Sequence, residues 1–184
     1  MQYPVVCILG RRGSGKTCLM TAIAVDEYKT TKRRVFANYH IKGIPADIIT
    51  FAELMELPEY LTNAIVLLDE LQVGADSYET MSKSNKAINT FVTQLRKRKV
   101  TLYYTTQVFT QITRRVRLQT NFIFQLNETK TPGVTHLQVA EYIPGAPSTI
   151  IRDEVLDLRD YFKYYDTDEV IHFRDDSKEN TKMA

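Results

Sequence analysis

The stretch that most constrains this chain is residues 10–17, GRRGSGKT, directly after the apolar run VVCIL. It fits the pattern G-x-x-x-x-G-K-[ST] at every defined position, and it stands between a predicted strand and a predicted helix. Its glycines allow the backbone to turn so that successive N–H groups point inward at phosphate oxygens. The sequence therefore predicts a phosphate-binding loop, in a fold where a buried strand runs into a helix through that loop.

The loop predicts a site for ATP with Mg²⁺. Lys16 is expected to reach the β- and γ-phosphates, and the Thr17 hydroxyl to ligate the metal ion. The helix that begins near Gly15 adds the positive end of its dipole. The residues expected to bind the nucleotide are Gly10, Arg11, Arg12, Gly13, Ser14, Gly15, Lys16, Thr17 and Cys18.

Short apolar runs alternate with helical patterns along the rest of the chain. Strands are predicted at residues 4–9, 34–40, 64–70, 100–107, 122–126 and 136–143, and helices at 15–28, 51–61 and 86–97, with an interruption at Pro58 and a further short helix within 153–170. Nearly continuous apolar strands between helices are typical of a mainly parallel central sheet with helices on both faces. We expect an α/β fold with one domain over residues 1–172 and a disordered acidic and polar tail over 173–184.

A pair of acids follows the third predicted strand. The run AIVLLDE ends in Asp69 and Glu70, where ligands of open α/β sheets bind. Asp69 is expected to hold Mg²⁺ through water, and Glu70 to orient and polarise a water molecule for attack on the γ-phosphate. Because a small-molecule kinase needs no such base, the pair favours an ATPase. Gln107, at the end of the next strand, is expected to sense the γ-phosphate or position that water.

Composition bears on the partners and the cellular compartment that we expect for this protein. The 184 residues carry a net charge of only +2, so the total does not argue for nucleic acid, but basic residues gather at 32–34, 96–99 and 114–117. Cys7 and Cys18 are read as buried apolar residues in a reducing, intracellular compartment. The sequence shows no signal peptide and no stretch of about 20 apolar residues.

Together the motifs GRRGSGKT, IVLLDE and VTLYYTTQ, with a helix ending in LRKRK, resemble the FtsK/HerA superfamily of P-loop motors. Within it, the small size resembles genome-packaging ATPases of tailless icosahedral viruses with internal membranes. The resemblance covers roughly residues 3–125. It implies a RecA-like core, a homo-oligomeric ring, double-stranded DNA as the translocated partner, and a capsid or virion-membrane protein that docks the motor. It also implies a location in the host cytoplasm, transiently at the capsid, or in the virion.

The resemblance also suggests which arginine completes a neighbouring subunit's site. Arg96 occupies the family's arginine position, although Leu95 stands where the family has glycine. Arg98 is the second choice, and Arg115 and Arg117 follow.

DNA contacts are expected from basic residues. A loop over residues 71–85 is expected to face the centre of the ring. The expected phosphate contacts are Lys83 and Lys86 near that loop and Arg114, Arg115 and Arg117 on a second surface.

Two other functions compete with a packaging motor. One is a membrane-associated assembly ATPase of filamentous phages, similar to the zonula occludens toxin family, whose members usually continue into a transmembrane segment. The other is a non-motor P-loop protein, such as a small kinase or a nucleotide-regulated binding module, which would need a nucleoside pocket with a mobile lid.

Overall fold

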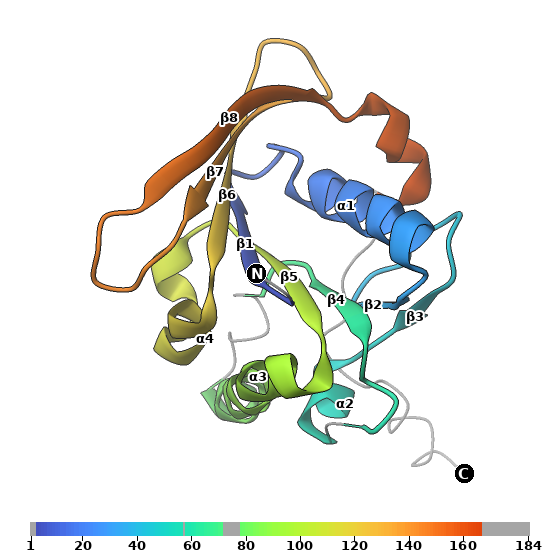
Figure 1. Cartoon of the computed structure of the whole chain (residues 1–184), viewed down its shortest axis with the longest axis vertical. Helices are drawn as coiled ribbons and strands as arrows, with labels where there is room; N and C mark the ends of the chain where they lie inside the picture. Colours follow the sequence, from blue (N-terminus) through green and yellow to red (C-terminus); the bar gives the residue numbers. More distant parts are fainter. Residues whose placement is uncertain (1–2, 57, 72–77, 167–184) are drawn as a thin grey trace.

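The described part of this computed structural model, residues 3–56, 58–71 and 78–166, forms one sheet with helices packed on it (Figure 1). The side chains of residues 51, 52, 55 and 78–87 and the predicted tail lie outside that description. The strands are β1 (Val5–Gly10), β2 (Arg34–Ala37), β3 (Ala46–Ile48), β4 (Ala64–Leu68), β5 (Thr101–Thr106), β6 (Phe122–Glu128), β7 (Val134–Glu141) and β8 (Thr149–Asp157). The helices are α1 (Lys16–Thr31), α2 (Phe51–Glu56), α3 (Tyr78–Arg98) and α4 (Arg114–Gln119), with 3-10 turns η2 (Phe109–Gln111) and η3 (Arg159–Tyr164).

The sheet is mainly parallel, as predicted. Its order is β3-β2-β4-β5-β1-β6-β7-β8. The first six strands in this order, β3 to β6, all run parallel to one another. Only the last two pairings among the described strands, β6 with β7 and β7 with β8, are antiparallel. The loop predicted to bind phosphate leaves β1, which has β5 on one side and β6 on the other.

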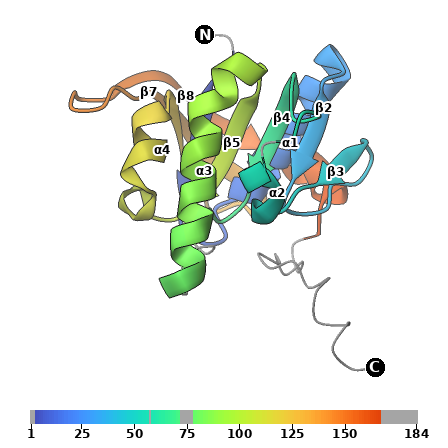
Figure 2. The same cartoon turned by 90° about the horizontal axis from the view of Figure 1, so that it is seen from below.

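Helices cover both faces of this sheet, and each face has its own core. Along β4 the side chains alternate, so that Val66 and Leu68 pack with α2, α3 and α4, whereas Ile65 and Leu67 pack with α1. Figure 2 shows α2, α3 and α4 on the near side of the strands, with α1 behind them. Burial on both faces explains why the parallel strands read as continuous apolar runs.

Several sequence expectations were wrong in detail. The helix expected within residues 153–170 begins only at Arg159 and is a 3-10 turn, because residues 149–157 form β8 instead. This strand lies at the sheet edge, where its side chains are largely exposed and carry no alternating apolar pattern. The short strand β3 and the helix α4 were not predicted, and α3 begins at Tyr78, eight residues before the expected start.

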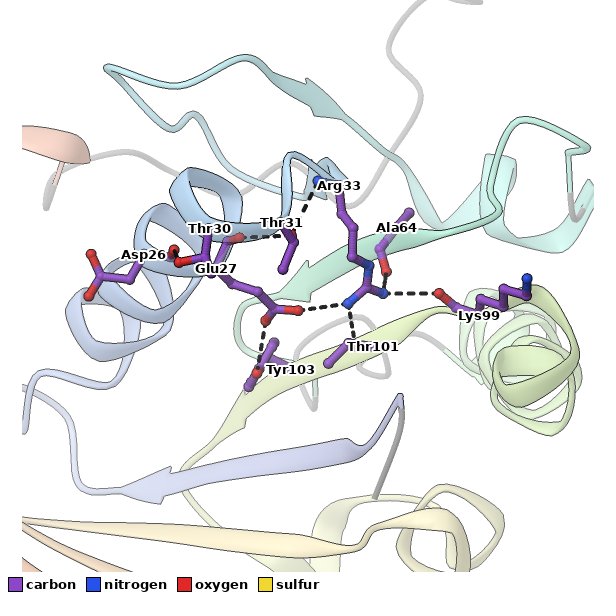
Figure 3. Close-up of polar contacts among 9 residues, drawn as sticks. All are labelled: Asp26, Glu27, Thr30, Thr31, Arg33, Ala64, Lys99, Thr101 and Tyr103. Carbon is purple, nitrogen blue, oxygen red and sulfur yellow. Dashed lines mark hydrogen bonds and ion pairs between the residues drawn. The ribbon is translucent and has the colours of Figure 1, made fainter.

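An arginine clamp holds the amino-terminal edge of the strands together (Figure 3). The Arg33 guanidinium donates to Glu27 Oε1 of α1 at 2.7 Å and to Thr101 Oγ1 of β5 at 3.0 Å. It also donates to the carbonyl oxygens of Ala64 and Lys99, where β4 starts and where the chain approaches β5. The Arg33 side chain is only 12% exposed, so these four hydrogen bonds form in a largely buried setting and join α1, β4 and the start of β5.

We expect Arg33→Ala to lower the free energy of unfolding by about 2–4 kcal/mol, because it removes the donor to Glu27 Oε1 and to two backbone carbonyls and leaves Glu27 with the Tyr103 hydroxyl alone. The measurement is urea unfolding followed by circular dichroism. Arg152→Ala is the matched control, since Arg152 pairs with Glu154 on the exposed strand β8 and is 64% exposed. It should cost less than about 1 kcal/mol. Equal losses in the two variants would contradict the clamp.

Candidate nucleotide-binding site

The loop after β1 has the conformation that its glycines were expected to allow. Gly13 and Gly15 have φ of 84° and 89°, the left-handed region that side chains disfavour. At Gly10 the constraint is space, since a Cβ there would stand 2.5 Å from Ser14 Oγ and 2.9 Å from the carbonyl oxygen of Leu126. The loop therefore depends on glycine at each of these three positions.

The polar groups of the loop suit a bound anion. The Ser14 hydroxyl is buried and makes no hydrogen bond. Lys16 is 7% exposed, and its ammonium group donates to the carbonyl oxygen of Arg11 at 2.8 Å, which folds it back over the loop. Burial lowers the pKa of Lys16, while the carboxylates of Asp69, Glu70 and Glu128 act in the opposite direction. A phosphate group would give both side chains the partner that suits them.

Asp69 is held by two hydroxyls and one amide. Thr17 Oγ1 donates to Asp69 Oδ2 at 2.9 Å, and Thr105 Oγ1 donates to Asp69 Oδ1 at 2.5 Å. The Asp69 amide N–H donates to Asn38 Oδ1 at 2.7 Å, and the Asn38 amide returns a bond to the Asp69 carbonyl. Burial raises the pKa of the Asp69 carboxyl, and the Thr105 and Thr17 hydrogen bonds oppose that rise. The carboxylate is thereby fixed beside the loop residue predicted to ligate the metal ion.

Asn38 and Thr105 belong to this arrangement but were not predicted from the sequence. Thr105 lies two residues before Gln107, and because β5 pairs with β4 in register, its hydroxyl meets Asp69. Asn38 follows β2, the neighbour of β4 on the other side. A polar residue at the carboxyl end of a buried strand is the signal that could have revealed both, as it did Asp69, Glu70 and Gln107.

Glu70 directly follows Asp69 and shares the Thr105 hydroxyl with it. Its φ is 48°, and its N–H donates to Thr105 Oγ1 at 2.8 Å, so one threonine fixes both acids. The residue is half-buried and lines the same cavity as Lys16 and Thr17. A positive φ is uncommon for a non-glycine residue, and here the hydrogen bond to Thr105 helps to hold it.

A cavity of about 1110 Å³ opens from the loop. Arg12, Gly13, Ser14, Gly15, Lys16, Thr17, Cys18, Asp69 and Glu70 are all among its lining residues, which brings most of the predicted set together. Burial raises the pKa of the Cys18 thiol to about 11, so this cysteine is a packing residue of the wall. Glu128, at the end of β6, is an unpredicted third carboxylate at the phosphate end.

The remaining catalytic candidates lie apart from this cavity. Gln107 follows β5 and is exposed, but it is not among the described lining residues. Arg96 is exposed near the end of α3. Arg98 donates to the carbonyl oxygens of Pro58 at 2.8 Å and Leu61 at 3.4 Å, so its guanidinium already holds the turn before β4.

The expected DNA contacts fall on two helices. Residues 78–85 are helical, so the loop expected over residues 71–85 is wrong for that part, and residues 72–77 lie outside the described chain. The side chains of Lys83 and Lys86 in α3 also lie outside the description. Arg114 and Arg115 are exposed on α4, whereas Arg117 is half-buried. These assignments remain predictions.

Oxygen ligands for a magnesium ion are present without a complete metal cage. Mg²⁺ prefers one or two carboxylate or hydroxyl oxygens together with substrate phosphates. Thr17 and Asp69 supply such oxygens, 2.9 Å apart. Within the described residues no group of three or more His, Cys, Asp and Glu side chains could hold a metal ion alone. The residues present therefore fit an ion that arrives with the nucleotide.

The chain is similar to known proteins in structure, but no match is found at the level of sequence. No family model and no curated protein matches the sequence. The N-terminal domain of zonular occludens toxin from Neisseria meningitidis is 20% identical with a TM-score of 0.60, over 90% of this chain and 100% of that one. The DNA-packaging ATPase of Sulfolobus turreted icosahedral virus is 13% identical with a TM-score of 0.59, over 83% and 98%. A KaiC-like protein from Pyrococcus horikoshii is 14% identical with a TM-score of 0.58, over 83% and 84%.

These similarities establish the fold. Identities of 11–20% are too low to transfer the role of any residue from these proteins to this chain. The shared feature is the P-loop architecture. The predicted RecA-like P-loop fold is confirmed, and so is the predicted structural resemblance to viral packaging ATPases. In the part of the chain that is described, no helix is long and apolar enough to cross a bilayer. The chain has the fold of a RecA-like P-loop NTPase.

We expect Thr105→Val to weaken magnesium-dependent nucleotide binding about tenfold, because Asp69 loses a charged hydrogen bond while the volume is kept. The measurement is calorimetric titration with a non-hydrolysable ATP analogue, once with Mg²⁺ and once with EDTA. Affinity in EDTA should be unchanged. Thr110→Val, an exposed threonine in η2, is the matched control. An equal loss of affinity with and without Mg²⁺ would contradict this role of Thr105.

Proposed function

We propose that this chain is an ATPase that uses hydrolysis to move double-stranded DNA, as a motor that packages a viral genome into a preformed capsid. The observation that supports hydrolysis is the hydrogen bond from Thr17 to Asp69, with Glu70 one residue further at the same cavity. It brings a phosphate loop, a metal-binding pair and a free carboxylate to one edge of the sheet. Binding alone needs no carboxylate in the position of Glu70.

Each residue has a distinct part in this reaction. The loop N–H groups and Lys16 bind the β- and γ-phosphates and fix the terminal phosphorus atom. Thr17 and Asp69 hold Mg²⁺, which neutralises phosphate charge when it is bound. Glu70 accepts a proton from the attacking water, and its left-handed backbone and the Thr105 bond keep its position.

We expect Lys16→Ala to abolish tight nucleotide binding, and Glu70→Gln to bind normally but turn over at least about a hundredfold more slowly, because an amide cannot take the proton. Phosphate release and calorimetric binding measure the two effects separately. Glu141→Gln is the matched control, since Glu141 is exposed at the far end of β7. Near-normal turnover in Glu70→Gln would remove Glu70 from the mechanism.

The proposed motor is a homo-oligomeric ring with hydrolysis at subunit interfaces. Arg96 lies near the end of α3, just before the start of β5, whereas the phosphate loop leaves the opposite end of the neighbouring strand β1. Strands of six residues separate these edges by about 20 Å. Arg96 therefore cannot complete the site of its own subunit, and a part in hydrolysis requires the site of a neighbour. We place the ring in the host cytoplasm, docked through a capsid or virion-membrane protein.

We expect binding to double-stranded DNA to stimulate phosphate release and to weaken steeply with salt, without sequence preference, because the contacts are to phosphates. Replacing Arg114 and Arg115 with Ala should reduce the slope of log affinity against log salt by up to about 2. The control removes two exposed arginines elsewhere, Arg34 and Arg152. Binding that is insensitive to salt would count against the motor.

A second candidate is the assembly ATPase of filamentous phages. It is favoured by the zonular occludens toxin domain, which is 20% identical and is covered along its whole length. The same measurements separate the two. Hydrolysis that is normal in the wild type, lost in Glu70→Gln and indifferent to double-stranded DNA would favour the second candidate.

A further inference from the structure

The sheet ends in two very different edge strands. At one end β3 has only three residues, whereas at the other end β8 has nine, and Figure 1 shows β8 beyond β7 on the outside of the sheet. Among the described strands, β8 pairs with β7 alone. Its outer side therefore presents a row of backbone N–H and C=O groups with which no described strand pairs. An edge of this length is able to accept a further strand.

The sequence of β8 gives this edge little protection. Proteins often prevent edge pairing with lysine or proline, and TIIRDEVLD contains neither. A bulge at Ile151, which has no partner position on β7, does protect one end, but the register from Arg152 to Asp157 is unbroken. Ile151 and Val155 are 56% and 64% exposed. A partner that covered these apolar side chains would be stabilised by their burial.

The side chains of β8 are complementary to a second copy of the same strand. When two copies run antiparallel with Asp153 on a two-fold axis, Arg152 lies opposite Glu154 of the partner subunit, and Ile151 lies opposite Val155 of the partner subunit. Within one chain, Arg152 Nε and Glu154 Oε1 are already 2.8 Å apart on one face of the strand. The pairing therefore gives each of these charges an opposite charge both along its own strand and across the axis.

The unfavourable contact in this arrangement is the pair of Asp153 residues on the axis, because like charges directly opposite one another are destabilising. Two residues of β7 in the same subunit contact this carboxylate. Gln138 Nε2 donates to Asp153 Oδ2 at 3.0 Å, and His136 Nε2 lies 2.5 Å from Asp153 Oδ1. Since β7 is on the side away from the free edge, these contacts draw the carboxylate away from the axis and limit the repulsion.

We propose that β8 is an interface with a second copy of this chain, in which two β8 strands pair antiparallel about a two-fold axis at Asp153 and join two sheets into one. The inference goes beyond the proposed function and does not depend on it, because no residue of the nucleotide-binding site takes part. A two-fold contact uses the same surface on both copies and is complete with two, whereas a ring repeats a contact between two different surfaces. The β8 interface therefore joins copies in pairs, whether or not they also form rings.

Disulfide crosslinking of the full chain tests the pairing and its register. Cys7 and Cys18 are buried, so a cysteine placed on β8 reports on that strand. Directly opposite residues of an antiparallel pair have Cα atoms about 4.5–5.5 Å apart, which a disulfide can span. We expect Asp153→Cys, on the axis, to form covalent dimers under mild oxidation. Thr149→Cys should not, because the two copies of that position would be about 27 Å apart.

A second pair of variants tests the register while Asp153 is kept. Ile151→Cys and Val155→Cys lie opposite each other in the proposed pairing, so a mixture of the two proteins should form a mixed disulfide dimer. Either protein alone should crosslink poorly, because like positions would be about 14 Å apart. Crosslinking that is equally efficient at positions 149 and 153, or no mixed dimer of the second pair, would overturn the interface.

Sedimentation without nucleotide measures the association of chains that carry no added cysteine. We expect the wild type to dimerise as its concentration rises, and Val155→Asp to weaken dimerisation at least about tenfold, because the pairing would bury a carboxylate against Ile151 of the partner subunit. Ile48→Asp is the matched control, since Ile48 is 44% exposed on the opposite edge strand, β3. It should leave dimerisation unchanged. A wild type that stays monomeric at every concentration, or equal losses in the two variants, would overturn the interface and leave the ATPase proposal intact.

Discussion

The hydrogen bonds that join Thr17 and Thr105 to Asp69 are the constraint on which the functional edge depends. They tie the start of α1 to the ends of β4 and β5. This is possible only because β5 lies between β4 and β1, so that three parallel strands deliver their carboxyl ends to one place. The Glu70 amide completes the arrangement by donating to Thr105 as well. One threonine hydroxyl therefore fixes both acids.

The two edges of the parallel sheet differ in how their polar groups are arranged. At the amino-terminal edge, Arg33 satisfies the carbonyls of Ala64 and Lys99 with one guanidinium. At the carboxyl edge, Ser14 Oγ is buried without a hydrogen bond, and Lys16 is turned back onto the loop. A buried polar atom without a partner does not by itself mark a ligand site, because Arg33 Nε at the amino-terminal edge also lacks one. What distinguishes the carboxyl edge is that Ser14 lines a cavity together with Lys16 and Asp69, where a ligand would supply the missing partner.

How much the sequence predicts depends on whether a feature is local. The phosphate loop was predicted in full because its residues are consecutive, and the central strands because burial on both faces makes them continuous apolar runs. Thr105 and Asn38 escaped prediction because their role depends on strand register, which places Thr105 against a residue 36 positions earlier. The strand β8 escaped because an exposed edge strand needs no alternating apolar pattern, so the sequence did not distinguish it from a helix.

The same distinction bears on how the cavity is built. The glycines of the loop cannot be replaced without losing the turn, as the close approach at Gly10 shows. The far wall of the cavity is assembled from the β6–β7 turn and the segment after β8, which follow the parallel core in the chain and pair antiparallel with it. The end of the loop contacts this wall, because Cys18 Sγ donates to the carbonyl oxygen of Leu158 at 3.5 Å and a Cβ at Gly15 would stand 3.4 Å from Leu158 Cδ1. The hydrogen bonds described for Asp69 and Glu70 are formed instead with Thr17, Asn38 and Thr105, at the start of α1 and the ends of parallel strands. The two acids therefore depend on the parallel core, whereas the loop also depends on its antiparallel extension.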